Sequence, residues 1–159
     1  HKIAEIHYLK KLFSTVGAGS TPEECNQLSK GLIVYGVIII GNTLHHVCNS
    51  KYQHAEVYIV KLIKDAIKRY GIDRTIKMIH KQCFFLYRER SDKTIGSSKS
   101  CSHCCHMMRR ELPRQILRKL TIVWSDSDGL FYQTPAHKMW NTYISTKERI
   151  MKRVDFHKK

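Results

Sequence analysis

The sequence has few acidic residues to balance its basic ones, and it has no long hydrophobic run. Lysine and arginine number 28 against 13 aspartates and glutamates, so the 159-residue chain carries a formal net charge of +15. Such an excess suits a polyanionic partner, which means DNA, RNA or an anionic membrane surface. The alternative is a charge that only keeps the protein dispersed. Because no apolar run approaches the length that spans a bilayer, we expect no membrane-spanning segment.

The sequence also shows no signal peptide and no cysteine spacing of the kind that marks a disulfide framework. It begins at His1 rather than at Met, so we expect the natural chain to start earlier. Cys101, Cys104 and Cys105 crowd one short stretch, a spacing typical of metal ligation in a reducing compartment. We therefore expect an intracellular protein whose isolated cysteines are small core residues, namely Cys25, Cys48 and Cys83.

The spacing of apolar residues predicts one domain of the α/β class, with helices packed on a mixed sheet. Helices are expected at about residues 3–16, 21–30, 56–70, 73–80, 101–112 and 137–154, and strands at about 31–40, 43–48, 83–87, 120–124 and 130–133. Turn signals at Gly41-Asn42 and at residues 126–129 predict that the first two and the last two strands are antiparallel hairpins. The polar stretch 91–100 is expected to be a mobile loop at the mouth of a site.

Two short motifs stand at the beginnings of predicted helices, H-x-E at residues 54–56 and C-x-x-C at residues 101–104. Residues two apart do not share a helix face, so His54 and Glu56 can act together only in a first turn, whereas Cys101 and Cys104 face the same way. A helix N-terminus also favours thiolates. His54, Cys101 and Cys104 can therefore bind Zn²⁺ and leave its fourth position to water. Glu56, which is not a ligand, can then move protons for that water.

Each motif has a simpler interpretation when it is considered alone. An H-x-E pair is common by chance and is most often exposed, and C-x-x-C also occurs in redox sites and structural zinc sites. A structural zinc would need further ligands, for which five candidates are available in the sequence: His45, His46, His103, Cys105 and His106. The pairing of the motifs, their order and the strand predicted between them favour a catalytic zinc site.

Together the motifs resemble the signature of the cytidine deaminase-like superfamily, H-x-E followed by P-C-x-x-C. The similarity covers about residues 25–135 through the order of strands and helices. It implies a three-layer α/β/α fold with a mixed five-stranded sheet, and a zinc-dependent deaminase in which Glu56 is catalytic. His54 in place of a cysteine resembles nucleotide and polynucleotide deaminases more than free cytidine deaminases. Ser100 stands where the superfamily has its proline, which shapes the loop but binds nothing.

The resemblance also indicates residues that would contact the substrate. Asn49, at the end of the second predicted strand, corresponds to an asparagine that contacts the sugar or base; a turn-forming Asn is the alternative. Residues 98–100 are similar to the Ser-x-Ser that precedes the motif in polynucleotide cytidine deaminases, which adds Ser100. Trp124 lies at the end of the fourth predicted strand, where the family places residues on the substrate side. Both Trp124 and Tyr52, which lies just before His54, can stack on a base. Core or rim packing is the alternative for both aromatic residues.

Two features of the sequence point to substrates of different size. An antiparallel last hairpin resembles free-nucleoside deaminases and some bacterial toxin deaminases, whereas the tRNA adenosine and antiviral DNA cytidine types run these strands parallel. The net charge favours a nucleic acid, because a free nucleotide needs only one or two cations. Three candidate phosphate contacts flank the cysteine motif, namely Lys99, Arg109 and Arg110, and a solvated helix face is the alternative for them. Two more, Lys152 and Arg153, lie in the predicted basic C-terminal helix.

We therefore predict a zinc-dependent hydrolase that converts cytosine to uracil within single-stranded DNA or RNA. An activated water would attack C4 of the base while Glu56 passes a proton to the leaving ammonia. One alternative is a deaminase of free cytidine or deoxycytidine nucleosides or nucleotides. The other is a non-catalytic nucleic-acid-binding protein with a structural zinc. The choices between cytosine and adenine and between DNA and RNA stay open, as does the oligomeric state.

Overall fold

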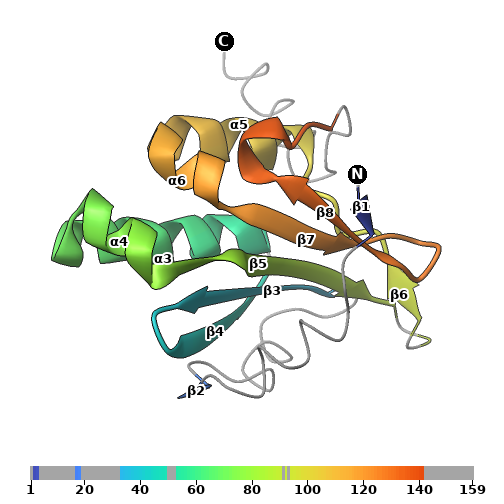
Figure 1. Cartoon of the computed structure of the whole chain (residues 1–159). Coiled ribbons are helices and arrows are strands. Elements are labelled where there is room, and N and C mark those ends of the chain that lie inside the picture. The colour runs from blue at the N-terminus through green and yellow to red at the C-terminus, as the bar shows by residue number, and fades with distance from the viewer. Residues whose placement is uncertain are drawn as a thin grey trace, which may run out of the picture.

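The chain has a mixed α/β fold, seen in a computed structural model that describes residues 2–3, 17–18, 33–49, 53–90, 92 and 94–141. Five strands form the main part of an open sheet, in the order β4 (Thr43–Cys48), β3 (Ile33–Ile40), β5 (Ile79–Glu89), β7 (Thr121–Ser125) and β8 (Phe131–Pro135). Two-residue strands extend it, with β1 (Lys2–Ile3) on β8, β2 (Gly17–Ala18) on β4 and β6 (Ile95–Gly96) on β5 (Figure 1).

The strand directions confirm both predicted hairpins. Strands β3 and β4 pair antiparallel, as do β7 and β8, while β5 runs antiparallel to β3 and parallel to β7. Gly41 turns the first hairpin with φ +62°, a conformation that glycine adopts without steric cost. The parallel pair β5 and β7 needs a crossover connection, and the helices between these two strands supply it.

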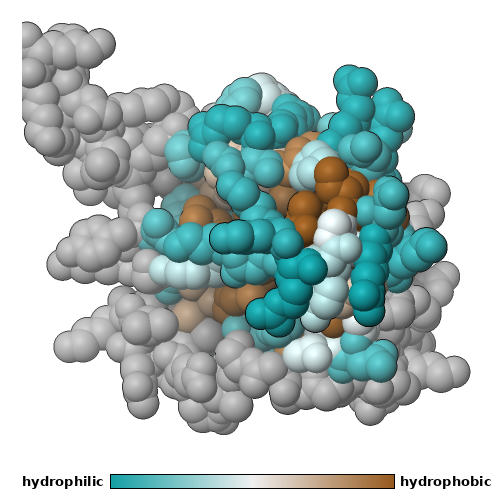
Figure 2. Space-filling view, turned by 90° about the vertical axis from the view of Figure 1, so that its left-hand side faces the viewer, coloured by the Kyte–Doolittle hydropathy of each residue, from teal (hydrophilic) through white to brown (hydrophobic). Residues whose placement is uncertain are grey.

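Helices α3 (Ala55–Tyr70), α4 (Ile72–Met78), α5 (Ser102–Glu111) and α6 (Arg114–Lys119) form one layer in the described part of the chain. Helix α3 packs on β3 and β4 and also against α5, while α4 packs against α6. Hydrophilic side chains cover most of the face that carries α4 and the end of α3, with hydrophobic ones between them (Figure 2). The predicted helix 21–30 and most of the helix predicted for residues 3–16 lie outside the described residues. A helical layer on the other face of the sheet, as in a three-layer fold, therefore stays a prediction.

Both faces of the central strands are buried, which explains their nearly continuous apolar sequence. Gly36 faces α3, and its cross-strand partner Leu86 therefore shares that face. The next residues along these strands, Val37 and Phe85, point the other way and are also buried. Alternate residues of β3 and β5 are thus buried on both sides of the sheet.

Several elements inside the domain differ from the sequence-based expectation. No element was predicted for residues 113–119, where the structure has helix α6 directly after Pro113. Helix α4 begins at Ile72, one residue before the predicted start at residue 73, and the Thr75 hydroxyl donates a hydrogen bond to the Gly71 carbonyl at 2.7 Å. Strand β5 starts at Ile79, where the helix was expected to continue, because its first residues pair with the end of β3.

The predicted terminal helices are wrong where the structure describes them. Lys2 and Ile3 form a strand that pairs with β8, so a helix does not begin at residue 3. Residues Ala136–Lys138 form the 3-10 turn η1, and the chain then becomes extended at Met139, with ψ 125°. Met139 is buried and its carbonyl accepts a hydrogen bond from Arg109 at 2.8 Å, which holds it out of a helix. The rest of the predicted helix 137–154 lies outside the described residues.

Candidate metal centre

Two helix beginnings carry the motif residues, as the sequence predicts. His54 is the extended residue that precedes α3, and Glu56 lies in the first turn of that helix. Cys101 is the extended residue that precedes α5, and Cys104 lies in its first turn. Because α3 and α5 pack against each other, these two N-termini come together in space.

The three predicted ligands form a cluster that can hold a metal ion. The Nδ1 atom of His54 lies 3.2 Å from Cys104 Sγ and 3.5 Å from Cys101 Sγ, and the three candidate ligand atoms all lie within 4.8 Å of one another. A tetrahedral zinc with ordinary bond lengths would separate a nitrogen and a sulfur ligand by about 3.6 Å. The cluster therefore needs only small adjustments to accept the ion, and its donor set of one imidazole and two thiols suits zinc.

No fourth His, Cys, Asp or Glu joins this cluster in the described part of the chain. Cys105 is adjacent in sequence but points elsewhere, since its thiol is directed at the Ser100 carbonyl at 3.6 Å. His103 and His106, also considered as ligands of a structural zinc, are exposed on α5. A site with three protein ligands keeps one coordination position for water or substrate.

The thiols of the cluster differ in how readily they ionise. The pKa of Cys101 falls to about 4, because the Cys104 thiol donates a hydrogen bond to its sulfur. The pKa of Cys104 is raised for the same reason and by burial. Burial likewise raises the pKa of Cys105 to about 11, as expected for a thiol with no role in binding a metal. Of the two thiols, Cys101 is therefore the one that ionises more readily.

Glu56 lies beside the cluster without belonging to it. Its side chain is 4% exposed, and burial raises the pKa of its carboxyl, with His54 acting in the opposite direction. A side-chain interaction with Cys104 places the carboxyl next to a ligand. A buried carboxyl with a raised pKa beside a candidate metal site is able to accept and release a proton.

Gly36, which was not among the predicted site residues, positions the beginning of α3. A Cβ at this position would lie 2.8 Å from Ile59 Cδ1 and 2.9 Å from Val47 Cγ2, closer than such atoms can approach. It would also lie 3.4 Å from the Cβ of Ala55, the residue between His54 and Glu56. The absence of a side chain thus lets α3 rest on β3. The available signal was a single glycine within a strand of β-branched residues, which often marks a close approach of another element.

The segment that leads to Cys101 is anchored, so the prediction of a mobile loop for residues 91–100 is wrong where these residues are described. Strand β6 pairs with the end of β5. The buried Ser98 hydroxyl donates to the Leu86 carbonyl and accepts from the Ser125 amide, both at 2.8 Å, and the Ser98 amide donates to the Ser125 carbonyl. These bonds fix the segment across β5 and β7 and hold the two cysteines in place.

Ser100, a predicted substrate contact, has a buried hydroxyl with no hydrogen-bond partner among the described residues. It directly precedes Cys101. A buried hydroxyl without a partner costs about 1–3 kcal/mol, so such groups usually have a reason to persist. A ligand that supplies the missing hydrogen bond would be such a reason.

Trp124, the predicted stacking residue, is buried at the end of β7. Its ring stacks on Tyr132 with centroids 5.1 Å apart, and its Nε1 donates to the Thr134 hydroxyl at 3.1 Å. The ammonium of Lys99 lies 5.5 Å from the centre of the ring. Lys99 therefore connects Trp124 to the segment that carries the cysteines, although it was predicted as a phosphate contact.

The other candidate residues lie in different parts of the molecule. Asn49 follows β4, and its side-chain oxygen accepts a hydrogen bond from the Val34 amide at 2.9 Å. Arg109 and Arg110 lie at the opposite end of α5 from the cluster, where Arg110 contacts Glu111 at 3.1 Å. Substrate and phosphate contacts by these residues stay predictions. Tyr52, Lys152 and Arg153 lie outside the described residues.

Comparison with known proteins does not assign a family. The chain matches no protein-family model, and no curated protein and no solved structure gives a significant match. Within the described ranges, none of the helices combines the length and hydrophobicity required to cross a membrane.

Proposed function

We propose that the protein is a zinc-dependent hydrolase that deaminates cytosine in a nucleic acid. The observation that carries this proposal is the buried Glu56 carboxyl beside a cluster of three ligands, which no other described His, Cys, Asp or Glu completes. Structural zinc sites have four protein ligands, whereas catalytic sites keep one position open. The arrangement therefore favours catalysis over a structural role.

The chemistry requires a nucleophile and a proton carrier. Zinc, when bound, would lower the pKa of a water molecule and so make it a nucleophile near neutral pH. Glu56 would take the proton of this water and deliver it to the amino group at C4 of cytosine. A C–O bond forms at C4, the C–N bond breaks, and cytosine and water become uracil and ammonia. The raised pKa of Glu56 suits a group that must both accept and donate.

The charge supports a polyanionic substrate. The formal net charge of +15 far exceeds what a single nucleotide needs, and each phosphate that a cation neutralises adds affinity by releasing counterions. In the superfamily that the two motifs resemble, a His rather than a Cys in the first motif is also typical of nucleotide and polynucleotide deaminases. Both points support cytosine within a strand.

A second candidate is a deaminase of free cytidine or deoxycytidine nucleosides or nucleotides. The observation in its favour is the antiparallel pairing of β7 and β8, in which Val123 opposes Gln133. By resemblance this hairpin is typical of free-nucleoside deaminases, although some bacterial toxin deaminases share it. The two candidates have the same metal cluster and the same role for Glu56, so they differ only in substrate.

One experiment separates these possibilities. The zinc-loaded protein is incubated with mixed single-stranded DNA and RNA oligonucleotides, and in parallel with free cytidine nucleotides, and ammonia release and sequence changes are measured. We expect C-to-T changes in the oligonucleotides, and their loss in Glu56→Ala, which should retain zinc. Ammonia from free nucleotides alone would favour the second candidate. Salt-dependent binding with no ammonia from any substrate would contradict both and indicate a structural zinc.

A further inference from the structure

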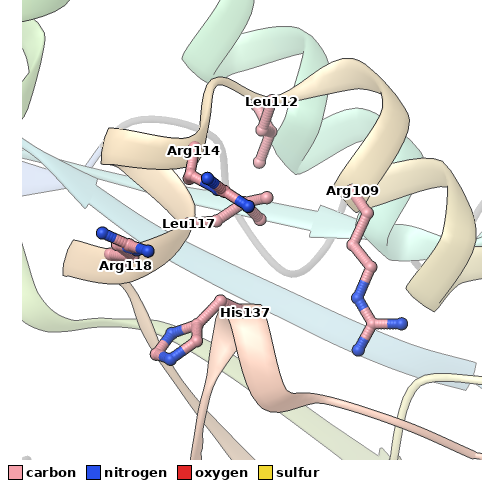
Figure 3. A pocket seen from close by; sticks show the side chains of 6 residues that line it. All are labelled: Arg109, Leu112, Arg114, Leu117, Arg118 and His137. Carbon is pink, nitrogen blue, oxygen red and sulfur yellow. The ribbon is translucent and has the colours of Figure 1, made fainter.

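A pocket of about 360 Å³ lies between α5, α6 and η1 (Figure 3). It is at the opposite end of α5 from the metal cluster. Its lining is three arginines, one histidine and two leucines: Arg109, Leu112, Arg114, Leu117, Arg118 and His137. The leucines are buried and form an apolar base, while the four basic side chains are exposed. Leu112 lies eight residues beyond Cys104, which is about 12 Å along the helix axis.

No carboxylate lines this pocket. The ion pairs seen among the described residues join Glu111 to Lys64 and to Arg110, and neither includes a residue of the pocket. Basic groups gathered around one cavity repel each other, and an anion bound between them removes that repulsion. Three guanidinium groups supply planar arrays of donors that match the oxygens of a phosphate.

An exposed aromatic residue lies beside the pocket. Trp140 is 48% exposed, and the guanidinium of Arg109 lies 5.6 Å from the centre of its ring. The His106 ring meets it edge-on, with centroids 5.4 Å apart. Arg109 is itself held by a hydrogen bond to the Met139 carbonyl, so the cation that connects the pocket and the indole is fixed in place.

Basic groups beside an exposed aromatic ring are the recurrent elements of surfaces that bind single strands, because cations follow the phosphates and bases stack on the ring. We propose that this surface binds a single-stranded nucleic acid, with a phosphate group in the pocket at Arg114, Arg118 and His137 and a base against Trp140. The inference rests on the proposed function only for the class of ligand. Binding here requires neither Glu56 nor the metal ligands.

The first test is charge reversal in the pocket. Arg114→Glu with Arg118→Glu is compared with Lys61→Glu and Lys68→Glu, which change the net charge equally at exposed positions of α3 outside the pocket. Both pairs are made in the Glu56→Ala protein, so that no substrate is consumed, and binding of a fluorescent single-stranded oligonucleotide is followed by anisotropy. The pocket pair should lose tenfold or more in affinity. Its slope of log affinity against log salt should fall by about 0.7 for each phosphate that the protein no longer neutralises.

The control pair should change the affinity by much less than the pocket pair. Equal losses in the two pairs would show that only the total charge matters and would overturn the proposal. Thermal melts of all variants show that the fold is retained, which the exposure of the four substituted side chains favours.

The second test concerns stacking. Trp140→Ala should weaken oligonucleotide binding by about tenfold, and Trp140→Phe should restore most of it, because the smaller ring still offers a stacking face. Unchanged binding in Trp140→Ala would remove the base contact. Inorganic phosphate and a cytidine mononucleotide serve as competitors, and displacement of the oligonucleotide by inorganic phosphate at similar concentration would show a free-anion site instead.

The outcome is distinguishable from that of the proposed function. If no substrate releases ammonia but the pocket variants lose binding, the deaminase proposal fails and the binding surface stands. If the Arg114 and Arg118 substitutions, made in the otherwise unaltered protein, leave oligonucleotide deamination unchanged across a range of salt, the surface fails and the deaminase proposal stands.

Discussion

His54 Nδ1 lies 3.2 Å from Cys104 Sγ, although fifty residues separate the two in the sequence. Helices α3 and α4 and strand β5 all occur between them. The contact therefore exists only after β5 has paired with β3 and α5 has packed on α3. The metal cluster is thus a product of the tertiary fold rather than of either motif alone.

Cys104→Ser should remove zinc from the protein, while Cys105→Ser should retain it. Both thiols are buried and adjacent in sequence, but only Cys104 belongs to the cluster. A serine hydroxyl is a poor zinc ligand, and we expect affinity to fall by more than tenfold. Zinc content by elemental analysis and affinity by chelator competition measure the difference. Equal zinc loss in the two variants would indicate a general effect of packing.

Glu56→Gln should stabilise the metal-free protein near neutral pH. In the zinc-loaded protein the same substitution should abolish deamination. The folded-state pKa of Glu56 is raised, so its contribution to stability is complete below its unfolded pKa and is lost as pH rises through the folded value. Glutamine carries no charge at either pH, so we expect the substitution to raise the free energy of unfolding by about 1 kcal/mol or more at pH 7 and by little at pH 4. Chemical denaturation in chelator at both pH values measures it. The same gain at pH 4 would contradict the argument.

The sequence was sufficient to predict the metal cluster because the chemistry restricts where its residues can lie. His54 and Glu56 are two apart and can share a site only in the first turn of a helix, and α3 begins there. The two hairpins followed from their turn residues in the same way. The helix beginnings and the turns depend on local rules that the rest of the fold does not override, whereas the meeting of the two motifs was inferred from their pairing and order.

Other features depend on contacts that a local pattern does not contain. Ser98 belongs to a polar stretch that is typical of a mobile loop, and only the alignment of Leu86 and Ser125 in neighbouring strands gives it partners. Arg114 and Arg118 indicate a solvated surface until α6 and η1 bring them beside His137. Tertiary neighbours decide such cases, and the neighbours are distant in sequence.

Ser98→Ala and Ser100→Ala should have opposite effects on stability. The Ser98 hydroxyl makes two hydrogen bonds to backbone groups, so its removal should cost about 1–3 kcal/mol. The Ser100 hydroxyl has no partner among the described residues, so its removal should cost nothing and should stabilise by up to about 1 kcal/mol. If Ser100 contacts the substrate, the Ser100→Ala protein should nevertheless deaminate more slowly. Denaturant unfolding and steady-state kinetics of both variants check this, and a destabilised Ser100→Ala would show that its hydroxyl has a structural partner.

Gly36→Ala should displace the beginning of α3 and weaken zinc binding. The new methyl group would overlap Ile59 Cδ1, which lies 2.8 Å from its position, and overpacking of this kind costs about 1–3 kcal/mol. Ile59→Val removes this carbon, while the overlap with Val47 Cγ2 at 2.9 Å remains. The double variant should therefore be more stable than the sum of the two single effects predicts, and it should regain part of the zinc affinity. Additive effects on unfolding and on zinc affinity would show that the two residues do not meet.

A metal ion held by His54 and Cys101 would link two points of the chain that are 47 residues apart. The unfolded chain has no such cluster, so an ion bound there would favour the native state and slow unfolding. Metal supply would then set how long each molecule survives before a protease reaches its opened backbone. The abundance of the chain in a cell would then follow the concentration of the ion.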